Sequence, residues 1–283
     1  ATDSLDRVVL SVGDGVVMAN GTYDRKSTRF DLNLTGKQVP LPLVLAFLPP
    51  NDNIPVISGS VDIAAHAIGI GENSETYNFT FDGVARTVTV GENAIGDVTF
   101  NGTTVDQVLT AKLVANLEGR AQEINGTMRF GDETLPFAVT TDFDQSPLSP
   151  YIAFVPQLKG IPISGTGTGK IHLSGTLRVR NSRGELVFNT SNFSGSAQFS
   201  QLALTVQDTP LAAVEPLSII FDRTKVDFVN AKFAGGGSNM TISGTVALTN
   251  DATNNLSVDG RISLNLLNLA TVDTFFAGNA DVA

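Results

Sequence analysis

The only two histidines of this chain occupy equivalent places in a repeated motif. The segments IPVISGSVDIAAHAIG and IPISGTGTGKIHLSG align without a gap when Ile57 is placed on Ile163, and both read Ile-Ser-Gly, six residues, then His66 or His172. A histidine can bind a metal or transfer a proton near neutral pH, but a metal site needs about three protein ligands. No second histidine lies near either one, and His172 alternates with apolar neighbours. We therefore expect both to be polar residues on the outer face of a strand.

A glycine-rich segment is similar to a phosphate-binding loop. In GTGTGK, residues 165–170, Ser164 stands where that motif needs its first glycine, and a strand pattern rather than a helix follows Lys170. We expect these alternate glycines to ease a bend or to allow close approach of another backbone. The chain has no cysteine and no Gly-x-Ser-x-Gly elbow, which excludes thiol chemistry and the usual setting of a serine nucleophile.

The acidic side chains show no spacing that defines a site. Asp and Glu number 28 and are scattered through expected turns, for example at Asp14, Asp52, Asp132 and Asp251. A pair of carboxylates that hydrolyses a glycosidic bond depends on spatial proximity, which spacing does not reveal, so a carboxylate hydrolase stays open as an alternative. The preferred interpretation is a protein that is not an enzyme, with no metal and no cofactor.

The composition is acidic but poor in charge. The formal net charge is −10, and the 18 Lys and Arg residues form no cluster, which argues against nucleic acid as a partner. Charged residues make up 16% of the chain and hydrophobic residues 42%, whereas about 25% charged residues is usual in soluble domains. This balance predicts an apolar surface larger than a closed core requires.

Alternation of apolar and polar residues predicts an all-β protein. RFDLNLTG places Phe30, Leu32 and Leu34 on one face of a strand, and many such runs end at Gly, Asn or Asp. We expect a long antiparallel sheet in meander order that curls as its strands twist. Three runs, KIHLSGTLRVR, MTISGTVALT and LSVDGRISLNLL, contain the residues expected to line its apolar side: Leu173, Leu177, Val179, Ile242, Val246, Leu248, Val258, Ile262, Leu264 and Leu266.

Short apolar helices are expected at three places, residues 40–48, 146–158 and 268–278. Each follows a strand, and the first two precede an Ile-Ser-Gly strand, so the chain is expected to repeat every hundred residues or so. The expected units are 1–40 (partial), 41–147, 148–267 and 268–283 (partial), and the whole of 1–283 is expected to be an interior segment of a longer protein.

Two arrangements would account for the apolar strand faces. Three short helices cannot cover them, so the sheet either packs on another sheet, as in an array of structural or adhesin-type β-sandwiches, or forms an open trough whose apolar lining binds a ligand. A helix inserted at the same point of each repeat and the low charge content favour the trough.

The repeat texture resembles the TamB and AsmA-like family of bridge-like lipid-transfer proteins, which are built from repeating β-groove units. The segments that carry the resemblance are FDLNLTGKQVPLPLVLAFL with VISGSVDI, TLPFAVTTDFDQSPLSPYIAFVPQLKGIPISGTGTGKIHLSGTL, and the region from FAGGGSNMTISGTVALT to the last residue. In that family a strand is followed by a short amphipathic helix and a new Ser-Gly or Ala-Gly strand. The resemblance covers essentially the whole chain.

The resemblance implies a U-shaped trough, sometimes called a β-taco, with an apolar interior. It implies a location in the periplasm of a diderm bacterium, with the parent protein anchored in the inner membrane. The implied ligands are phospholipid acyl chains, moved between inner and outer membranes. The implied partners are the remainder of the same long chain, the inner membrane and an outer-membrane Omp85-type barrel, with a role in outer-membrane protein assembly.

Overall fold

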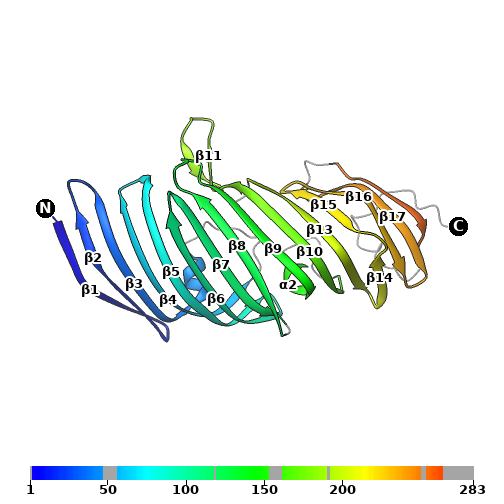
Figure 1. The fold of residues 1–283 in the computed structure, drawn as a ribbon, viewed down its shortest axis with the longest axis horizontal. Helices are drawn as coiled ribbons and strands as arrows, with labels where there is room; N and C mark the ends of the chain where they lie inside the picture. Colours follow the sequence, from blue (N-terminus) through cyan, green and yellow to red (C-terminus); the bar gives the residue numbers. More distant parts are fainter. Residues whose placement is uncertain are drawn as a thin grey trace. The chain divides into compact units, whose positions relative to one another are not determined.

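The computed structural model describes residues 2–46, 56–117, 119–152, 161–189, 192–249 and 253–263. Within them, eighteen strands and two short helices follow one another in this order: β1 Thr2–Val12, β2 Gly15–Asp24, β3 Arg29–Pro40, α1 Leu41–Leu45, β4 Ile57–Ile70, β5 Asn73–Val90, β6 Asn93–Val105, β7 Val108–Leu117, β8 Arg120–Arg129, β9 Pro136–Pro147, α2 Ser149–Ile152, β10 Ile163–Thr176, β11 Arg178–Arg180, β12 Leu186–Phe188, β13 Phe193–Val206, β14 Thr209–Ala213, β15 Leu217–Asp222, β16 Lys225–Gly235, β17 Ser238–Ala247 and β18 Asn255–Arg261 (Figure 1). The prediction of an all-β antiparallel fold with few short helices is confirmed.

Sixteen of the strands pair in one sheet, and β11 and β12 form a separate hairpin. The sheet follows chain order from β1 to β10 and continues through β13, β14, β16, β17 and β18, while β15 pairs with β13 and β16. Neighbouring strands joined by short turns pair side by side, as expected of a meander. The described strands therefore include no second sheet large enough to cover the first.

Compact packing divides the chain into two units. The first unit comprises residues 1–140 and 174–192, and the second comprises residues 141–173 and 193–283. In the first unit α1 contacts β3 and β4, and it is drawn behind the strands in Figure 1. The side chain of Leu41 lies 3.2 Å from the position that a Cβ on Gly59 of β4 would take.

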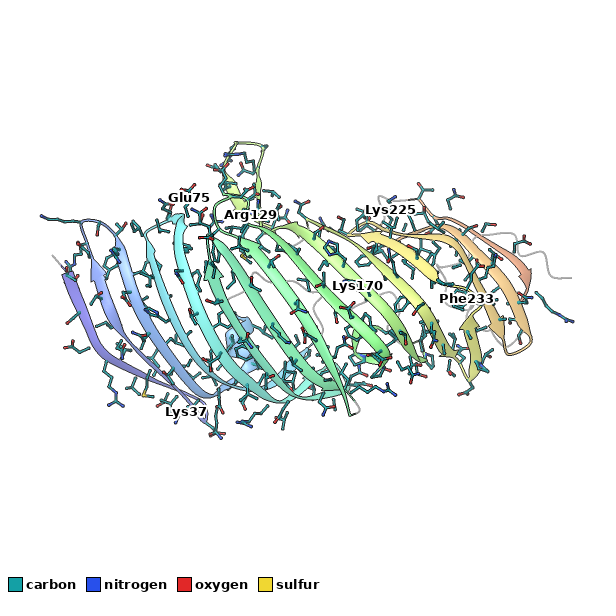
Figure 2. All side chains as sticks on the ribbon, in the orientation of Figure 1. Lys37, Glu75, Arg129, Lys170, Lys225 and Phe233 are labelled. Atoms are coloured by element: carbon teal, nitrogen blue, oxygen red, sulfur yellow. The ribbon has the colours of Figure 1, made fainter. Side chains whose placement is uncertain are left out.

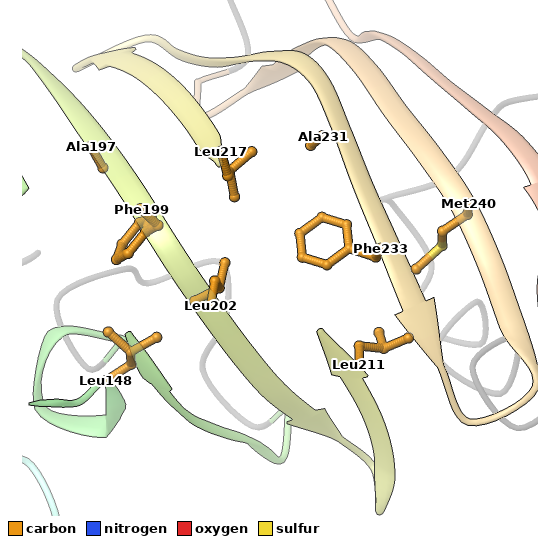
Figure 3. Close-up of a cluster of buried hydrophobic side chains, with 9 residues drawn as sticks. All are labelled: Leu148, Ala197, Phe199, Leu202, Leu211, Leu217, Ala231, Phe233 and Met240. Atoms are coloured by element: carbon orange, nitrogen blue, oxygen red, sulfur yellow. The ribbon is translucent and has the colours of Figure 1, made fainter. Parts of the chain in front are cut away.

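The second unit contains a buried cluster made of Leu148, which immediately precedes α2, and of side chains from β13, β14, β15, β16 and β17, which Figure 3 shows. Its members are Leu148, Ala197, Phe199, Leu202, Leu211, Leu217, Ala231, Phe233 and Met240. Ala231 is the most enclosed, with 1% of its surface exposed. Phe143 of β9 stacks edge-on against Tyr151 of α2 at 4.9 Å between ring centres. Burial of Tyr151 raises the pKa of its hydroxyl to about 12.

The two helices follow equivalent corners. Gln38 at the end of β3 and Gln145 at the end of β9 adopt left-handed φ angles of 51° and 47°. The backbone N–H of Gln38 donates to Asp62 Oδ1 at 2.8 Å, and that of Gln145 donates to Thr168 Oγ1 at 3.0 Å. Asp62 and Thr168 lie five residues after the aligned Ile57 and Ile163, where β4 and β10 begin.

The observed helices are shorter than the expected ones within the described residues. Leu41–Leu45 lies inside the expected 40–48, and Ser149–Ile152 lies inside the expected 146–158. Pro40 precedes α1 and Pro42 lies within its first turn, where a proline is tolerated. The third expected helix, residues 268–278, lies outside the described residues.

The run KIHLSGTLRVR does not continue as one strand. β10 ends at Thr176, and the N–H of Leu177 donates to Leu135 O at 3.2 Å instead of to a neighbouring strand of the sheet. Arg178 N–H donates to Thr134 O, and the side chain of Arg180 pairs with Glu133. These contacts with the loop before β9 direct the chain into the β11–β12 hairpin.

Candidate functional site

The first unit has a sheet face that is apolar across eight strands. In an antiparallel pair, residues directly opposite one another point to the same face, so the register defines two transverse rows. One row joins Val8, Ala19, Leu34, Ala65, Phe81, Gly102, Ala111 and Gly126. The next joins Leu10, Val17, Gly36, Ile63, Gly83, Phe100, Leu113 and Ile124. These sixteen residues define the apolar face, and none of them is polar or charged.

The opposite face of the same strands is polar. One of its rows joins Asn20, Asn33, His66, Thr80, Thr103, Thr110 and Thr127. His66 lies here, with Nε2 at 2.8 Å from Asp31 Oδ1, and Lys112 pairs with Glu123 at 2.5 Å. The hydrogen bond that the N–H of Gln38 donates to Asp62 is the main cause of the lowered pKa of this carboxyl group. The ion pair with Arg86 lowers the pKa further. One face of these strands is therefore apolar and the other is polar, and the polar face is suited to contact with water.

Several large side chains of the apolar face remain open to solvent. Leu10, Leu34 and Leu113 are exposed by 57%, 39% and 37%. Toward α1 the same face becomes closed, since Val61 is 3% and Ala85 is 6% exposed. An apolar surface that spans several strands and that no other described segment of the unit covers beyond α1 is typical of a site that binds an apolar partner.

Two aromatic rings of the apolar face lie over glycines of the neighbouring strand. Phe100 lies against Gly83, where an added Cβ would meet its Cζ at 2.5 Å. Phe81 lies against Gly102 in the same way, with Cε1 at 2.7 Å from the added Cβ. Rings that lie over a cross-strand glycine fill the space its missing side chain leaves, a pairing known to stabilise sheets.

The ten residues expected to line the groove lie in the C-terminal part of the chain, and the structure places them in several settings. Ile242, Val258 and Ile262 pack against the buried cluster of the second unit. Leu173 is half-buried on β10, and Val246 pairs with Val226. Leu248 follows β17, and its N–H donates to Thr224 O.

The other four residues are two of the first unit and two that the structure does not describe. Leu177 and Val179 lie in the first unit, at and within the β11–β12 hairpin. Leu264 and Leu266 lie outside the described residues. The ten assignments therefore stay predictions.

Sequence reasoning chose no lining residue on strands β1 to β8, although the alternation there is equally clear. What it lacked was the register: Leu34, Ala65 and Phe81 are distant in sequence and become neighbours only through pairing of β3, β4 and β5. The clue available in the sequence was a glycine two residues after a phenylalanine, as in FDGVA and FNGTT.

The polar groups of the described residues show simple pairings. Among these residues, no group of three or more His, Asp or Glu side chains is placed to hold a metal ion. Lys170 of the glycine-rich segment, labelled in Figure 2, lies 3.7 Å from Asp142, and His172 is exposed. The glycines of this segment meet other backbone closely, since a Cβ on Gly165 would lie 3.0 Å from the Cα of Leu204.

The fold and this face define a class: an antiparallel β-sheet protein with one polar face and one open apolar face. Comparison with protein-family models, curated proteins and solved structures gave no match. No helix among the described residues is both long enough and apolar enough to span a bilayer.

Proposed function

We propose that the apolar face binds phospholipids through their acyl chains and that the chain forms part of a lipid path between the two membranes of a bacterial envelope. The observation that carries the proposal is the pair of apolar rows in the first unit, in which Leu10, Leu34 and Leu113 remain substantially exposed. The periplasmic setting and the membrane partners, including an Omp85-type barrel, are supported by the resemblance to TamB and AsmA-like proteins.

The chemistry of the two faces supports a lipid as the ligand. Each methylene moved from water onto an apolar surface contributes about 0.8 kcal/mol, so an acyl chain gains affinity without any directional contact. A phospholipid headgroup would stay in water at the border of the face. The face offers apolar side chains on each of the successive strands β1 to β8, so acyl chains could find contacts at more than one place along it.

The direct test is organic extraction of protein purified without detergent, followed by mass spectrometry for phospholipid. A matched pair of variants localises the ligand. Leu34→Asp puts a charge on the apolar face, and Asn33→Asp puts the same charge on the polar face of the same strand. Circular dichroism establishes that both variants are folded.

We expect phospholipid to copurify with the wild type and with Asn33→Asp, and the amount to fall about tenfold in Leu34→Asp. If the charge keeps two methylenes of the acyl chain off the apolar face, the lost binding free energy accounts for a change of this size. If the wild type carries no phospholipid and binds none when it is added, the proposal is wrong. A structural array of β units would then be the better interpretation.

A further inference from the structure

A furrow one strand wide runs along β4 on the apolar face. Its floor is made of the smallest side chains, at Ala65, Ala67 and Gly69, which alternate on one face of the strand. Ala65 is paired with Leu34 on β3 and Phe81 on β5. Since neighbouring strands lie about 4.8 Å apart, the two walls stand about 10 Å apart at the backbone, and between them the floor projects by no more than a methyl group.

The walls of this furrow lean outward. A Cβ added to Gly21 on β2 would lie 2.9 Å from Leu32 Cδ2, so the side chain of Leu32 extends toward β2. On the other side the ring of Phe81 extends over Gly102 of β6. Both side chains therefore turn away from β4 and leave its floor uncovered.

Both ends of the furrow are closed. At one end the rings of Phe30 and Tyr77 meet over Gly69, where each would come within 2.6 Å of an added Cβ, and the rings pack edge-on with centres 5.9 Å apart. At the other end the face is buried at Val61, where α1 contacts β3 and β4. From Ala65 to the ring pair over Gly69 the floor of small side chains is about 14 Å long at roughly 3.4 Å per residue, and beyond Ala65 the side chain of Ile63 projects from β4 on the way to Val61. One acyl chain of a bilayer spans about 15 Å, half of its hydrocarbon core.

The furrow offers no hydrogen-bonding group to an occupant. From Ile63 to Ile68, every residue of β4 is paired with both β3 and β5, so the backbone amides of the floor already have partners. A peptide lying there would leave its own N–H and C=O groups without partners, which is costly. A hydrocarbon chain has no such groups.

We propose that this furrow holds one lipid acyl chain lengthwise, parallel to β4, between the Phe30–Tyr77 ring pair and the end covered by α1. This inference rests on the proposed lipid-binding function and adds the place, the direction and the number of chains in the first unit. An acyl chain oriented across the strands would have to cross the walls formed by Leu32, Leu34, Phe79 and Phe81.

The wild-type protein can be tested with two photoreactive probes. Each is a phosphatidylethanolamine with a diazirine in one acyl chain, placed near the ester in one probe and near the methyl end in the other. After illumination and proteolysis, mass spectrometry locates the adducts. We expect each probe to label one end of the same three strands, one around Ile63 and the other around Ala67 and Phe79.

A pair of variants on β4 provides the second measurement. Ala67→Phe fills the furrow, whereas Ala64→Phe places the same ring on the polar face of the same strand, where Ala64 is exposed. We expect Ala67→Phe to weaken labelling of β3, β4 and β5 about tenfold, the effect of lifting two methylenes off the floor. We expect Ala64→Phe to leave it unchanged. If Ala67→Phe does not fold, the labelling pattern of the wild type still decides.

The outcomes separate this inference from the proposed function. Adducts spread across several strands at one level, or equal labelling of Ala67→Phe and wild type, would show that lipid binds but not along β4. Loss of labelling when an apolar peptide is added before illumination would make a polypeptide the occupant and overturn the assignment. Absence of bound lipid anywhere on the wild type would overturn the proposed function itself.

Discussion

Phe81 on β5 and Gly102 on β6 form a cross-strand pair in which the ring takes the place of the missing side chain. They are directly opposite in the register, and the ring also lies 6.3 Å from that of Phe100. Phe100 is in turn opposite Gly83, so the two pairs alternate across β5 and β6. This arrangement places each ring over a glycine of the neighbouring strand, and it also draws Phe81 away from the floor of β4.

Gly102→Ala should therefore destabilise the first unit. The added methyl group would force the Phe81 ring to move within a packed surface, and overpacking of this kind costs about 1–3 kcal/mol. Gly126→Ala is the matched control, because it lies in the same row and its added Cβ would meet only Ala138 O, at 3.9 Å. Denaturant unfolding gives both values. Equal free energies of unfolding for the two variants would contradict the role assigned to Phe81.

The hydrogen bond at the Gln145 corner predicts a smaller loss of stability than the one expected for Gly102→Ala. Thr168→Val keeps the shape of the side chain but removes the hydroxyl that accepts the N–H of Gln145, and we expect a loss of about 0.5–1.5 kcal/mol. Thr166→Val on the same face of β10 is the control, with a change near zero. Both are measured by denaturant unfolding. A loss in Thr166→Val as large as that in Thr168→Val would show that the corner bond contributes nothing specific.

The equivalent corner at Gln38 predicts a dependence on pH. The hydrogen bond from Gln38 N–H, with Arg86 nearby, holds the pKa of Asp62 below its usual value of 3.8. A carboxyl whose pKa is lower in the folded state stabilises that state above the unfolded pKa and loses the effect as pH falls through the folded pKa. We expect unfolding curves measured from pH 6 downward to show a loss of stability below about pH 4. This part of the loss should be absent in Asp62→Asn. If the free energy of unfolding falls identically with pH below about 4 in both proteins, Asp62 makes no such contribution.

The buried cluster of the second unit predicts a large loss on truncation. Phe199 is 7% exposed and contacts Gly167 and Phe143, so Phe199→Ala should lower the free energy of unfolding by about 3–5 kcal/mol through the cavity it leaves. Ile220→Ala on β15 serves as the control, since Ile220 is 52% exposed and should cost well under 1 kcal/mol. Thermal and denaturant unfolding should agree on this order. The reverse order would mean that the cluster does not hold this unit together.

Much of the fold follows from local sequence. Alternation at Phe30, Leu32 and Leu34 is enough to predict a strand with one apolar face, because successive side chains of a strand point to opposite faces. The same reasoning placed His66 on the polar side, and it located α1 within a few residues, since proline and a short apolar run define where that helix can form. None of these inferences needs information about distant parts of the chain.

Other features depend on pairing between distant segments. The position of Phe81 opposite Gly102, the furrow over Ala67 and the departure of Leu177 from β10 are set by register and by hydrogen bonds to other strands. A register shift of one residue would turn each apolar side chain to the other face, and no local pattern fixes which residues lie opposite one another. The sequence by itself therefore determined which residues alternate and that one side of the strands is apolar. Only the tertiary structure decided which of them meet across strands, where the apolar face stays open and where it is closed, because these depend on packing between segments that local propensity does not connect.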